Sequence, residues 1–517
     1  MKYSDLLKRN ICLAGNGKIL YDISAFFHEM NVVQRLQTPT DADRYSHGSI
    51  GTIIVCSDDL VWQNVLGKRC LPFISYKDLF VMIDELETFY LDKNHYGKEI
   101  FIYGNGEMKE QLIQDNPNLK VDGFIEKIPK FRDGMFVIIA REPNAEIKAA
   151  FLSNGFRFGT DFHFFRPDKP KHYPSYYLNK TISDSLQFTL PCDYTGKALS
   201  IKHHGNVMAC CSAFELTFGN CLYTSIEEII HGIPAQIALL SIKNRTYSFC
   251  SNLCFMYRNN GYRLSDENEI QNNPRREQDM PQIKDFVVQL GYDRSCNLAC
   301  PSCRAHRITF PEDPQHIVQM IHDEAKSMTK LHPKNLRIGN GELFFSKYYR
   351  DIVFNSYESN SISLITNGIL FNGQNWNKLR SRYKKIAIEF SIDAVTEDTY
   401  TKLRRGNFIQ LLENLHYASI LRKMGEMLRF SISFVIQVEN FREMVDFVEM
   451  GNSLGADCIH FMKLNNFGHI SKDAFVQMDV YDPNNYHHSE FVDMLTNPCF
   501  RLPNVKFDNL NNFLEAL

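Results

Sequence analysis

The residues best suited to chemistry are three cysteines in the stretch Cys296-Asn-Leu-Ala-Cys300-Pro-Ser-Cys303. Three thiolates on one short loop can hold three irons of a four-iron cluster, because thiolate is the soft ligand that such clusters use. The fourth iron would then have no protein ligand and could bind and reduce a small molecule. The alternative is a zinc site completed by His306, although zinc cysteines usually occur as separate C-x2-C pairs. The spacing favours the iron–sulfur interpretation.

A second group of cysteines lies earlier in the chain and predicts a cage of four thiolates. Its proposed ligands are Cys192, Cys210, Cys250 and Cys254. Gly205, which lies between the first two, permits a hairpin turn that would bring them together. Structural zinc is an open alternative for this cage, because four thiolates suit zinc as well as iron. Cys211 and Cys221 have no assigned place, and either could replace one of the four.

Composition and charge limit the classes of protein that this chain can belong to. The 517 residues carry a formal net charge of −3, with 44% hydrophobic and 23% charged residues. This is the composition of an ordinary globular protein of roughly two to four domains. The charge argues against a nucleic-acid partner, and no apolar run approaches the length of a membrane span. The N-terminus lacks the apolar core of a signal peptide, so we expect a cytoplasmic protein with free thiols.

Residues 1–168 carry a weak internal repeat. The stretches 10–17 and 99–106 each read as a strand that runs into a glycine turn and then into a helix. Buried-strand runs follow each of them, at 52–56 and 135–140. Strands that alternate with helical stretches predict parallel βαβ units, and therefore a Rossmann-like α/β region.

The glycine turns of this region are candidates for nucleotide binding, because a helix N-terminus is a natural anion site. The dinucleotide fingerprint requires a third glycine, however, and Leu20 and Lys109 stand at that position. An acid, Glu126, follows the second turn only. We therefore favour plain structural turns. The second copy, through 123–126 to 151–156, resembles the small Rossmann-like modules found beside sugar-modifying enzymes.

The chain from 284 to 470 alternates strand-like and helix-like segments and forms the predicted core. Its strand candidates are 286–291, 335–339, 361–366, 386–392, 429–436 and 457–463. Phe441, Met444, Val445 and Val448 have the i, i+3, i+4, i+7 spacing of a helix that packs on a sheet. The predicted order of domains is a Rossmann-like region at 1–168, a linker at 169–190, a cysteine-rich domain at 191–261, a linker at 262–283, the core at 284–470 and a tail at 471–517.

Polar residues follow the strand candidates of the core, where parallel strands place their chemistry. They are Asn340-Gly341-Glu342, Thr366-Asn367-Gly368, Ser391, Asp393, Tyr400, Arg404 and Gln437. Each of these is ambiguous alone, because Gly-Glu or Ser-x-Asp is more often a turn or a cap. Their order along the chain, with one set for most strand ends, makes them candidates for a single site.

The cysteine spacing and these strand-end residues together resemble the radical SAM superfamily. The resemblance implies an α/β fold with a partial (β/α)6 TIM-like barrel as its core. It implies that Cys296, Cys300 and Cys303 hold a [4Fe-4S] cluster whose open iron chelates S-adenosyl-L-methionine. Asn340 departs from the family pattern, which has a glycine at that position.

The same resemblance implies contacts to S-adenosyl-L-methionine for particular residues. They are Gly341, Glu342, Ser391, Asp393 and Arg404, with Gln437 as a further polar candidate. The backbone and carboxylate of Glu342 would bind the amino group. Ser391 and Asp393 would serve the ribose hydroxyls, and Arg404 would meet the carboxylate of the methionine moiety.

The earlier cysteines resemble the auxiliary-cluster domain called SPASM, or its shorter Twitch form. This resemblance implies a second [4Fe-4S] cluster on the four cysteines between 192 and 254. The sequence departs from the family in two ways. The last pair is C-x3-C rather than C-x2-C, and the cysteine-rich domain precedes the core, whereas the family usually places it afterwards.

The resemblance also implies an activity. A flavodoxin- or ferredoxin-type donor would supply an electron, and S-adenosyl-L-methionine would yield a 5′-deoxyadenosyl radical that removes hydrogen from a substrate. A single auxiliary cluster and the sugar-type module favour a carbohydrate-type small molecule as substrate. Modification of a ribosomally made peptide is the alternative. A non-enzymatic zinc-binding scaffold is the alternative from another class.

Overall fold

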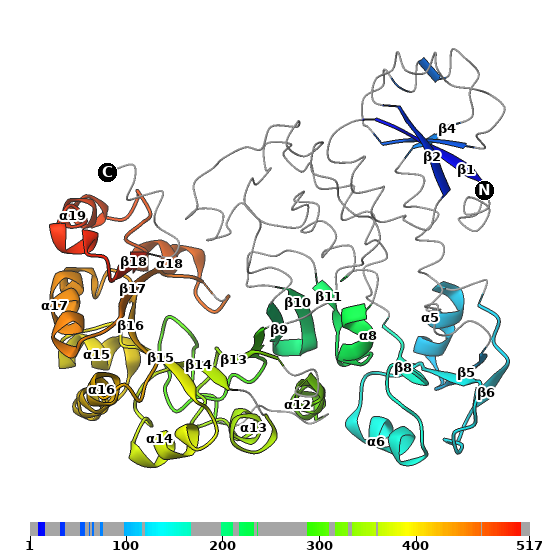
Figure 1. Cartoon of the computed structure of the whole chain (residues 1–517), viewed down its shortest axis with the longest axis horizontal. Coiled ribbons are helices and arrows are strands. Elements are labelled where there is room, and N and C mark those ends of the chain that lie inside the picture. The colour runs from blue at the N-terminus through cyan, green and yellow to red at the C-terminus, as the bar shows by residue number, and fades with distance from the viewer. Residues whose placement is uncertain are drawn as a thin grey trace. The chain divides into compact units, whose positions relative to one another are not determined.

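The computed structural model describes the following residues: 9–15, 31–36, 52–56, 62, 65–66, 73–75, 98–115, 119–166, 198–209, 217–231, 235, 287–309, 316–328, 333–357, 360–466 and 468–507. The chain divides into two compact units (Figure 1). The first comprises Met1–Gly196, Val207–Asn252 and Tyr262–Ile283, and the second comprises Lys197–Asn206, Leu253–Gly261 and Lys284–Leu517. No helix in the described part of the chain has the length and apolar character that a membrane crossing requires.

The secondary structure follows the chain in this order. The strands are β1 (Asn10–Ala14), β2 (Asn31–Leu36), β3 (Thr52–Val55), β4 (Phe73–Ser75), β5 (Glu99–Tyr103), β6 (Gly123–Ile125), β7 (Met135–Ile139), β8 (Phe162–Phe164), β9 (Ala198–Lys202), β10 (Asn206–Ala209), β11 (Thr217–Asn220), β12 (Val287–Gly291), β13 (Asn335–Ile338), β14 (Ser361–Thr366), β15 (Lys385–Ser391), β16 (Arg429–Ile436), β17 (Cys458–Lys463) and β18 (Val505–Phe507). The α-helices are α5 (Glu107–Asp115), α6 (Ala145–Ser153), α8 (Ile226–His231), α12 (Ile317–Ser327), α13 (Lys347–Asp351), α14 (Gly373–Arg380), α15 (Glu397–Arg404), α16 (Phe408–Lys423), α17 (Met444–Leu454), α18 (Lys472–Met478) and α19 (His488–Met494). The short helical turns are η3 (His203–Gly205), η5 (Ile352–Ser356), η6 (Phe441–Glu443) and η7 (Pro498–Arg501).

The internal repeat predicted in the first unit is present as two small parallel sheets. Their strand orders are β2-β1-β3-β4 and β6-β5-β7-β8, which is the same topology twice. Gly15 and Gly104 have nearly the same conformation, with φ of 145° and 144°. A Cβ at these positions would lie 2.7 Å from the carbonyl oxygen of Cys56 and 2.5 Å from that of Ala140. The close approach of neighbouring strands therefore requires glycine here, which supports the interpretation as structural turns.

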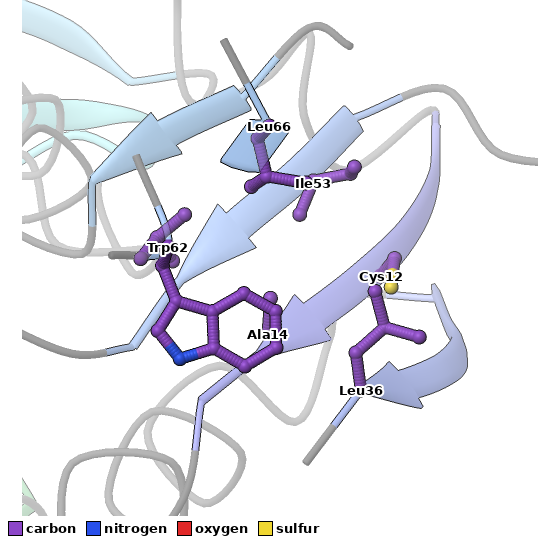
Figure 2. Packing of buried hydrophobic residues seen from close by; sticks show 7 residues of the cluster. Cys12, Ala14, Leu36, Ile53, Trp62 and Leu66 are labelled. Atoms are coloured by element: carbon purple, nitrogen blue, oxygen red, sulfur yellow. The ribbon is translucent and has the colours of Figure 1, made fainter. Parts of the chain in front are cut away.

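The first of these sheets has a compact apolar core (Figure 2). Cys12 and Ala14 of β1 and Ile53 of β3 form one buried cluster with Leu36, Trp62 and Leu66. Cys12 is fully buried, and burial raises the pKa of its thiol to about 12. This cysteine is therefore a small core residue rather than a metal ligand.

The second unit contains a parallel sheet in the order β9-β12-β13-β14-β15-β16-β17-β18. The six strands predicted for the core are β12 to β17, and each begins and ends within one residue of its predicted position. Two strands that flank these six differ from the prediction. β9 belongs to the predicted cysteine-rich domain but pairs with β12, and β18 belongs to the predicted tail but pairs with β17. The parallel α/β sheet is confirmed, and its closure into a partial barrel stays a prediction.

The two faces of this sheet differ because apolar and polar residues alternate along the strands. In β14, Ile362 and Leu364 are buried, whereas Ser361 and Ser363 between them are half-buried. The apolar face packs against helices, and α16 and α17 contact β16 and β17 (Figure 1). Three residues of the predicted stripe, Phe441, Met444 and Val448, are at most 1% exposed, whereas Val445 is half-buried.

The opposite face of the sheet is polar. The Nδ2 of Asn335 donates to the Oγ of Ser363 at 3.1 Å, and the Nδ1 of His460 lies 3.4 Å from a carboxylate oxygen of Glu389. These side chains are half-buried. A parallel sheet with one polar, partly accessible face offers a surface for a polar ligand.

Candidate metal centre

The three cysteines of the core lie on one loop directly after β12. Cys296 and Cys300 are each 7% exposed, and they pack with Leu298 in an apolar cluster that Cys303 and Ile369 border. The amides of Cys303 and Arg304 both donate to the carbonyl oxygen of Cys300, at 2.9 and 3.0 Å. These bonds wind the loop into a turn. The structure therefore brings together the cysteines that the sequence predicted as ligands.

Burial favours the neutral form of two thiols of this loop, those of Cys296 and Cys300. It raises the pKa of Cys296 to about 11, and it also raises the pKa of Cys300. Both thiols therefore bind a metal only by releasing a proton, since thiolate is the ligand form. The irons of a cluster would compensate the negative charge of a buried thiolate.

Hydrogen-bond donors already point at two of the sulfurs. Cys296 Sγ accepts from the Leu298 amide at 3.4 Å and from Asn367 Nδ2 at 3.6 Å. Cys303 Sγ accepts from a guanidinium nitrogen of Arg304 at 3.3 Å. Donors to sulfur are a regular feature of cluster environments, because they stabilise the negative charge on thiolate. The donor set therefore fits an iron–sulfur cluster.

Among the residues that the structure describes, no group of three or more His, Cys, Asp or Glu side chains is placed to hold a metal ion. A four-iron cluster distributes its thiolates over different irons, so its ligands stand further apart than those of a single zinc ion. His306, the fourth ligand of the zinc alternative, is exposed.

A buried carboxylate fixes the start of the cysteine loop. Asp293 is 1% exposed and accepts from the amide and the hydroxyl of Ser295, at 2.9 and 2.7 Å. It also accepts from the hydroxyl of Ser346, which caps α13 by accepting from the Tyr349 amide. The tyrosine hydroxyl in turn accepts from the Asp293 amide at 2.8 Å. The loop is thereby anchored to α13.

The loop after β13 closes directly over the cysteine loop. Asn340 and Gly341 have φ of 67° and 65°, and the Glu342 amide donates to the Ser295 carbonyl at 2.8 Å. A Cβ on Gly341 would lie 2.5 Å from the carbonyl oxygen of Asp293 and 2.8 Å from that of Ser295. Glycine is therefore required here for the contact between the two loops.

The carboxylate of Glu342 is fully buried and joins two strand ends. It accepts from the hydroxyl of Thr366 at 2.9 and 3.0 Å, from the Asn367 amide at 2.8 Å and from the Phe344 amide at 3.3 Å. Burial raises its pKa, and these hydrogen bonds oppose that rise. The carboxylate oxygens have about four acceptor positions, so the three donors within the protein occupy most of them.

The loop after β15 pairs an aspartate with an arginine. Asp393 has φ of 66°, and one of its oxygens accepts from Arg404 Nη1 at 2.9 Å. Arg404 Nη2 donates to the Ser391 carbonyl at 2.7 Å, and the Cys300 thiol lies 3.7 Å from the Arg404 carbonyl. Burial would lower the pKa of the guanidinium, but Cys300 and Asp393 outweigh it and raise that pKa. The predicted residues Ser391, Asp393 and Arg404 therefore lie beside the cysteine loop.

Two polar groups in this region are buried without a partner among the described residues. Gln437 is 1% exposed, and neither the oxygen nor the nitrogen of its amide makes a hydrogen bond. The Nε of Arg404 is also unsatisfied. Asn440 holds the end of β16 against Asp393 through its Nδ2, which donates to the carbonyls of Asp393 and Val435, each at 2.9 Å. Buried polar groups without partners are rare and suit a ligand that would satisfy them.

Two residues that join this site were missed in the sequence. Arg304 follows Cys303 directly, but a charged residue beside a cysteine is ordinarily read as solvent-exposed. Asn367 was noted only as part of a strand-end motif, yet its Nδ2 contacts Cys296 and donates to Asn297 at 2.8 Å. The adjacency of Arg304 to the third cysteine was the available signal.

A comparison with known families bears on the earlier cysteines. A model described as SPASM, an iron–sulfur cluster-binding domain, matches residues 192–255. The predicted SPASM resemblance is confirmed. All four proposed ligands fall within the matched segment, and the match supports iron–sulfur rather than zinc. Cys192, Cys210, Cys250 and Cys254 themselves lie outside the described residues. Gly205, in the described part of the SPASM segment, has φ of 81° in the turn between β9 and β10.

Several solved structures are similar to parts of this chain. One is Streptococcus suis SuiB bound to precursor peptide SuiA, with 12% identity over 44% of this chain and 51% of that chain and a TM-score of 0.34. Another is native anSMEcpe with bound AdoMet, with 14% identity, coverage of 44% and 65%, and a TM-score of 0.31. A third is the radical S-adenosylmethionine methyltransferase TsrM from Kitasatospora setae, with cobalamin and a [4Fe-4S] cluster bound, with 13% identity, coverage of 32% and 34%, and a TM-score of 0.25.

The chain spans about half the length of the SuiB structures that it matches. At these TM-scores the similarity carries no argument about activity or substrate. No similar sequence was found among curated proteins.

Proposed function

We propose that this protein is a radical SAM enzyme, in which Cys296, Cys300 and Cys303 hold a [4Fe-4S] cluster that binds S-adenosyl-L-methionine. The observation that carries the proposal is the cysteine loop itself. Its three cysteines border one apolar cluster at the carboxyl end of β12, and nitrogen donors face two of the sulfurs. When bound, the cluster and S-adenosyl-L-methionine would supply a one-electron cleavage that generates a radical able to remove hydrogen from a substrate.

The strand-end residues would bind and orient S-adenosyl-L-methionine. The unsatisfied Nε of Arg404 can donate to its carboxylate, while Asp393 fixes the guanidinium plane. The free amide of Gln437 can satisfy a further polar group. Ser391 and Asp393 remain the candidates for the ribose hydroxyls. Because the Glu342 carboxylate is occupied, we propose that it fixes the loop after β13, so that Gly341 and its neighbours present backbone carbonyls to the amino group.

The SPASM segment would hold an auxiliary [4Fe-4S] cluster on Cys192, Cys210, Cys250 and Cys254. We propose that this cluster accepts an electron from the substrate radical or binds the substrate. A flavodoxin- or ferredoxin-type protein would supply electrons to the first cluster. The glycine turns of the first unit have a structural explanation, so no nucleotide is proposed there.

The substrate of the proposed reaction carries hydroxyl or amide groups. This inference rests on the polar face of the sheet, where Ser363, Glu389 and His460 lie within strands β14, β15 and β17. A carbohydrate-type small molecule and a ribosomally made peptide both meet this description. Deuterated candidates of each class, incubated with the reconstituted enzyme, distinguish them by transfer of deuterium into 5′-deoxyadenosine.

Anaerobic purification and a cysteine variant test the proposal directly. We expect brown protein with about eight irons per chain, because each cluster holds four. In Cys300→Ala, iron should fall to about four per chain, and cleavage of S-adenosyl-L-methionine should be lost. A colourless zinc protein, or cleavage that Cys300→Ala leaves unchanged, would contradict it. Cys499→Ala is the matched control, because that cysteine lies in the turn η7 and has no proposed ligand role.

A further inference from the structure

Arg304 is a buried cation that lies against the three cysteines. It is 7% exposed, and its Nη2 donates to the Cys303 sulfur at 3.3 Å. Its Nη1 donates to the Arg294 carbonyl at 2.5 Å, so the guanidinium spans the loop from the residue before Ser295 to the third cysteine. Among the described residues, no carboxylate forms an ion pair with it.

A buried cation without a carboxylate partner is costly and calls for another counter-charge. The bond from Nη2 to the Cys303 sulfur places the guanidinium against the third cysteine, so thiolates on the cluster would supply that counter-charge. With neutral thiols this charge is absent, and with thiolates on a cluster it is present.

Arg404, whose carbonyl oxygen lies 3.7 Å from the Cys300 thiol, differs in this respect. Arg404 pairs with Asp393, so its charge is largely balanced within the protein. Arg304 therefore contributes the unbalanced positive charge beside the cluster site. A positive charge and an N–H donor to a ligand sulfur both favour the state of the cluster with one more electron.

We propose that Arg304 is a positioning residue that raises the reduction potential of the cluster held by Cys296, Cys300 and Cys303. This inference rests on the proposed function. The step that it affects is a one-electron reduction, in which a low-potential donor loses one electron and the cluster gains it, with no bond formed or broken. Through its fork geometry, Arg304 also holds Cys303 in the orientation that the loop requires.

The test compares the wild-type protein with R304Q, which removes the charge, and R304K, which keeps it. R307Q is the matched control, because Arg307 is exposed on the same loop and its guanidinium lies over the Phe345 ring at 5.5 Å. The reconstituted proteins are titrated anaerobically with dithionite and followed by electron paramagnetic resonance. The signal of this cluster is identified by its change when S-adenosyl-L-methionine is added.

At a fixed solution potential, we expect the ratio of reduced to oxidised cluster to fall at least tenfold in R304Q, which corresponds to a shift of about 59 mV for one electron. R304K should recover most of this ratio, and R307Q should match the wild type. An R304Q protein that retains iron and titrates at the wild-type potential overturns the proposal. A merely structural role would alter iron content but not the potential of the clusters that remain.

A second measurement decides the question if R304Q retains no iron at this site. Wild-type protein with nitrogen-labelled arginine side chains should show a hyperfine coupling between the reduced cluster and an arginine nitrogen. That coupling should disappear in R304K, and its absence from the wild type overturns the proposal. If instead no signal of the wild type responds to S-adenosyl-L-methionine, the proposed function itself has failed, and the two failures are thereby distinguished.

Discussion

The loops after β12 and β13 meet at Gly341, so we expect the addition of a methyl group there to be strongly destabilising. Its φ of 65° is unfavourable for alanine by roughly 1–2 kcal/mol. The added Cβ would also lie 2.5 Å from the Asp293 carbonyl oxygen and 2.8 Å from that of Ser295. Overpacking of this kind costs about 1–3 kcal/mol, and backbone atoms cannot rotate away. Gly341→Ala should therefore weaken the closure of the loops by about 3 kcal/mol or more.

Amide hydrogen exchange measures the opening of this contact at individual residues. The Glu342 amide donates to Ser295, and the Cys296 amide donates to the Ile308 carbonyl, each at 2.8 Å. A loss of about 3 kcal/mol should accelerate exchange of both amides roughly a hundredfold. Gly425→Ala is the matched control, because Gly425 has φ of 76° but nothing within 4 Å of an added Cβ. The control should leave these two amides unchanged. Equal protection in both variants would refute the packing argument.

Three further predictions concern polar groups of the second unit. Glu342→Ala leaves the Thr366 hydroxyl and the Asn367 amide without their acceptor, which should lower the free energy of unfolding by about 1–3 kcal/mol for each unsatisfied group. Urea unfolding should show a loss of that size. A urea midpoint like that of the wild type would contradict this prediction. Burial opposes ionisation of Asp351, but hydrogen bonds, including one from His322, outweigh it and lower its pKa to about 2. The contribution of Asp351 to the stability of the fold is therefore complete above the unfolded pKa of about 4 and is lost as the pH falls through about 2. On acidification, the thermal midpoint should fall less steeply in Asp351→Asn than in the wild type. Burial lowers the pKa of His322, although the neighbouring Asp351 opposes this shift. As the pH falls, His322 is therefore protonated in the unfolded chain before it is protonated in the folded protein, so stability should decline below about pH 6.5. His322→Gln should remove that decline.

The strands of the core could be predicted because their signal is local. Each is a short apolar or alternating run, and β12 to β17 follow these runs closely. β9 and β18 could not be placed from the sequence, because their membership of the sheet depends on pairing with β12 and β17 far along the chain. A strand of three to five residues gains its stability from such a neighbour rather than from its own composition.

The same distinction holds for the site. The cysteine loop was predictable because its three proposed ligands lie within one short stretch of the sequence, 296–303. The burial of Glu342 was not, since its carboxylate is occupied by donors from the next strand end. The motif predicted a ligand contact, which stays a prediction, and the structure adds that this carboxylate joins two strand ends. The contact of Asn367 with Cys296 likewise depends on tertiary packing, which no residue spacing records.

The central claim is that the cluster has one iron without a protein ligand and that S-adenosyl-L-methionine binds there. Electron–nuclear double resonance of the reduced protein, with S-adenosyl-L-methionine labelled at its amino nitrogen, tests this claim most directly. We predict a strong hyperfine coupling between the cluster and the labelled nitrogen in the wild-type protein, lost in Cys300→Ala. A reduced cluster that shows no coupling to the label, at concentrations where S-adenosyl-L-methionine binds, would contradict the account.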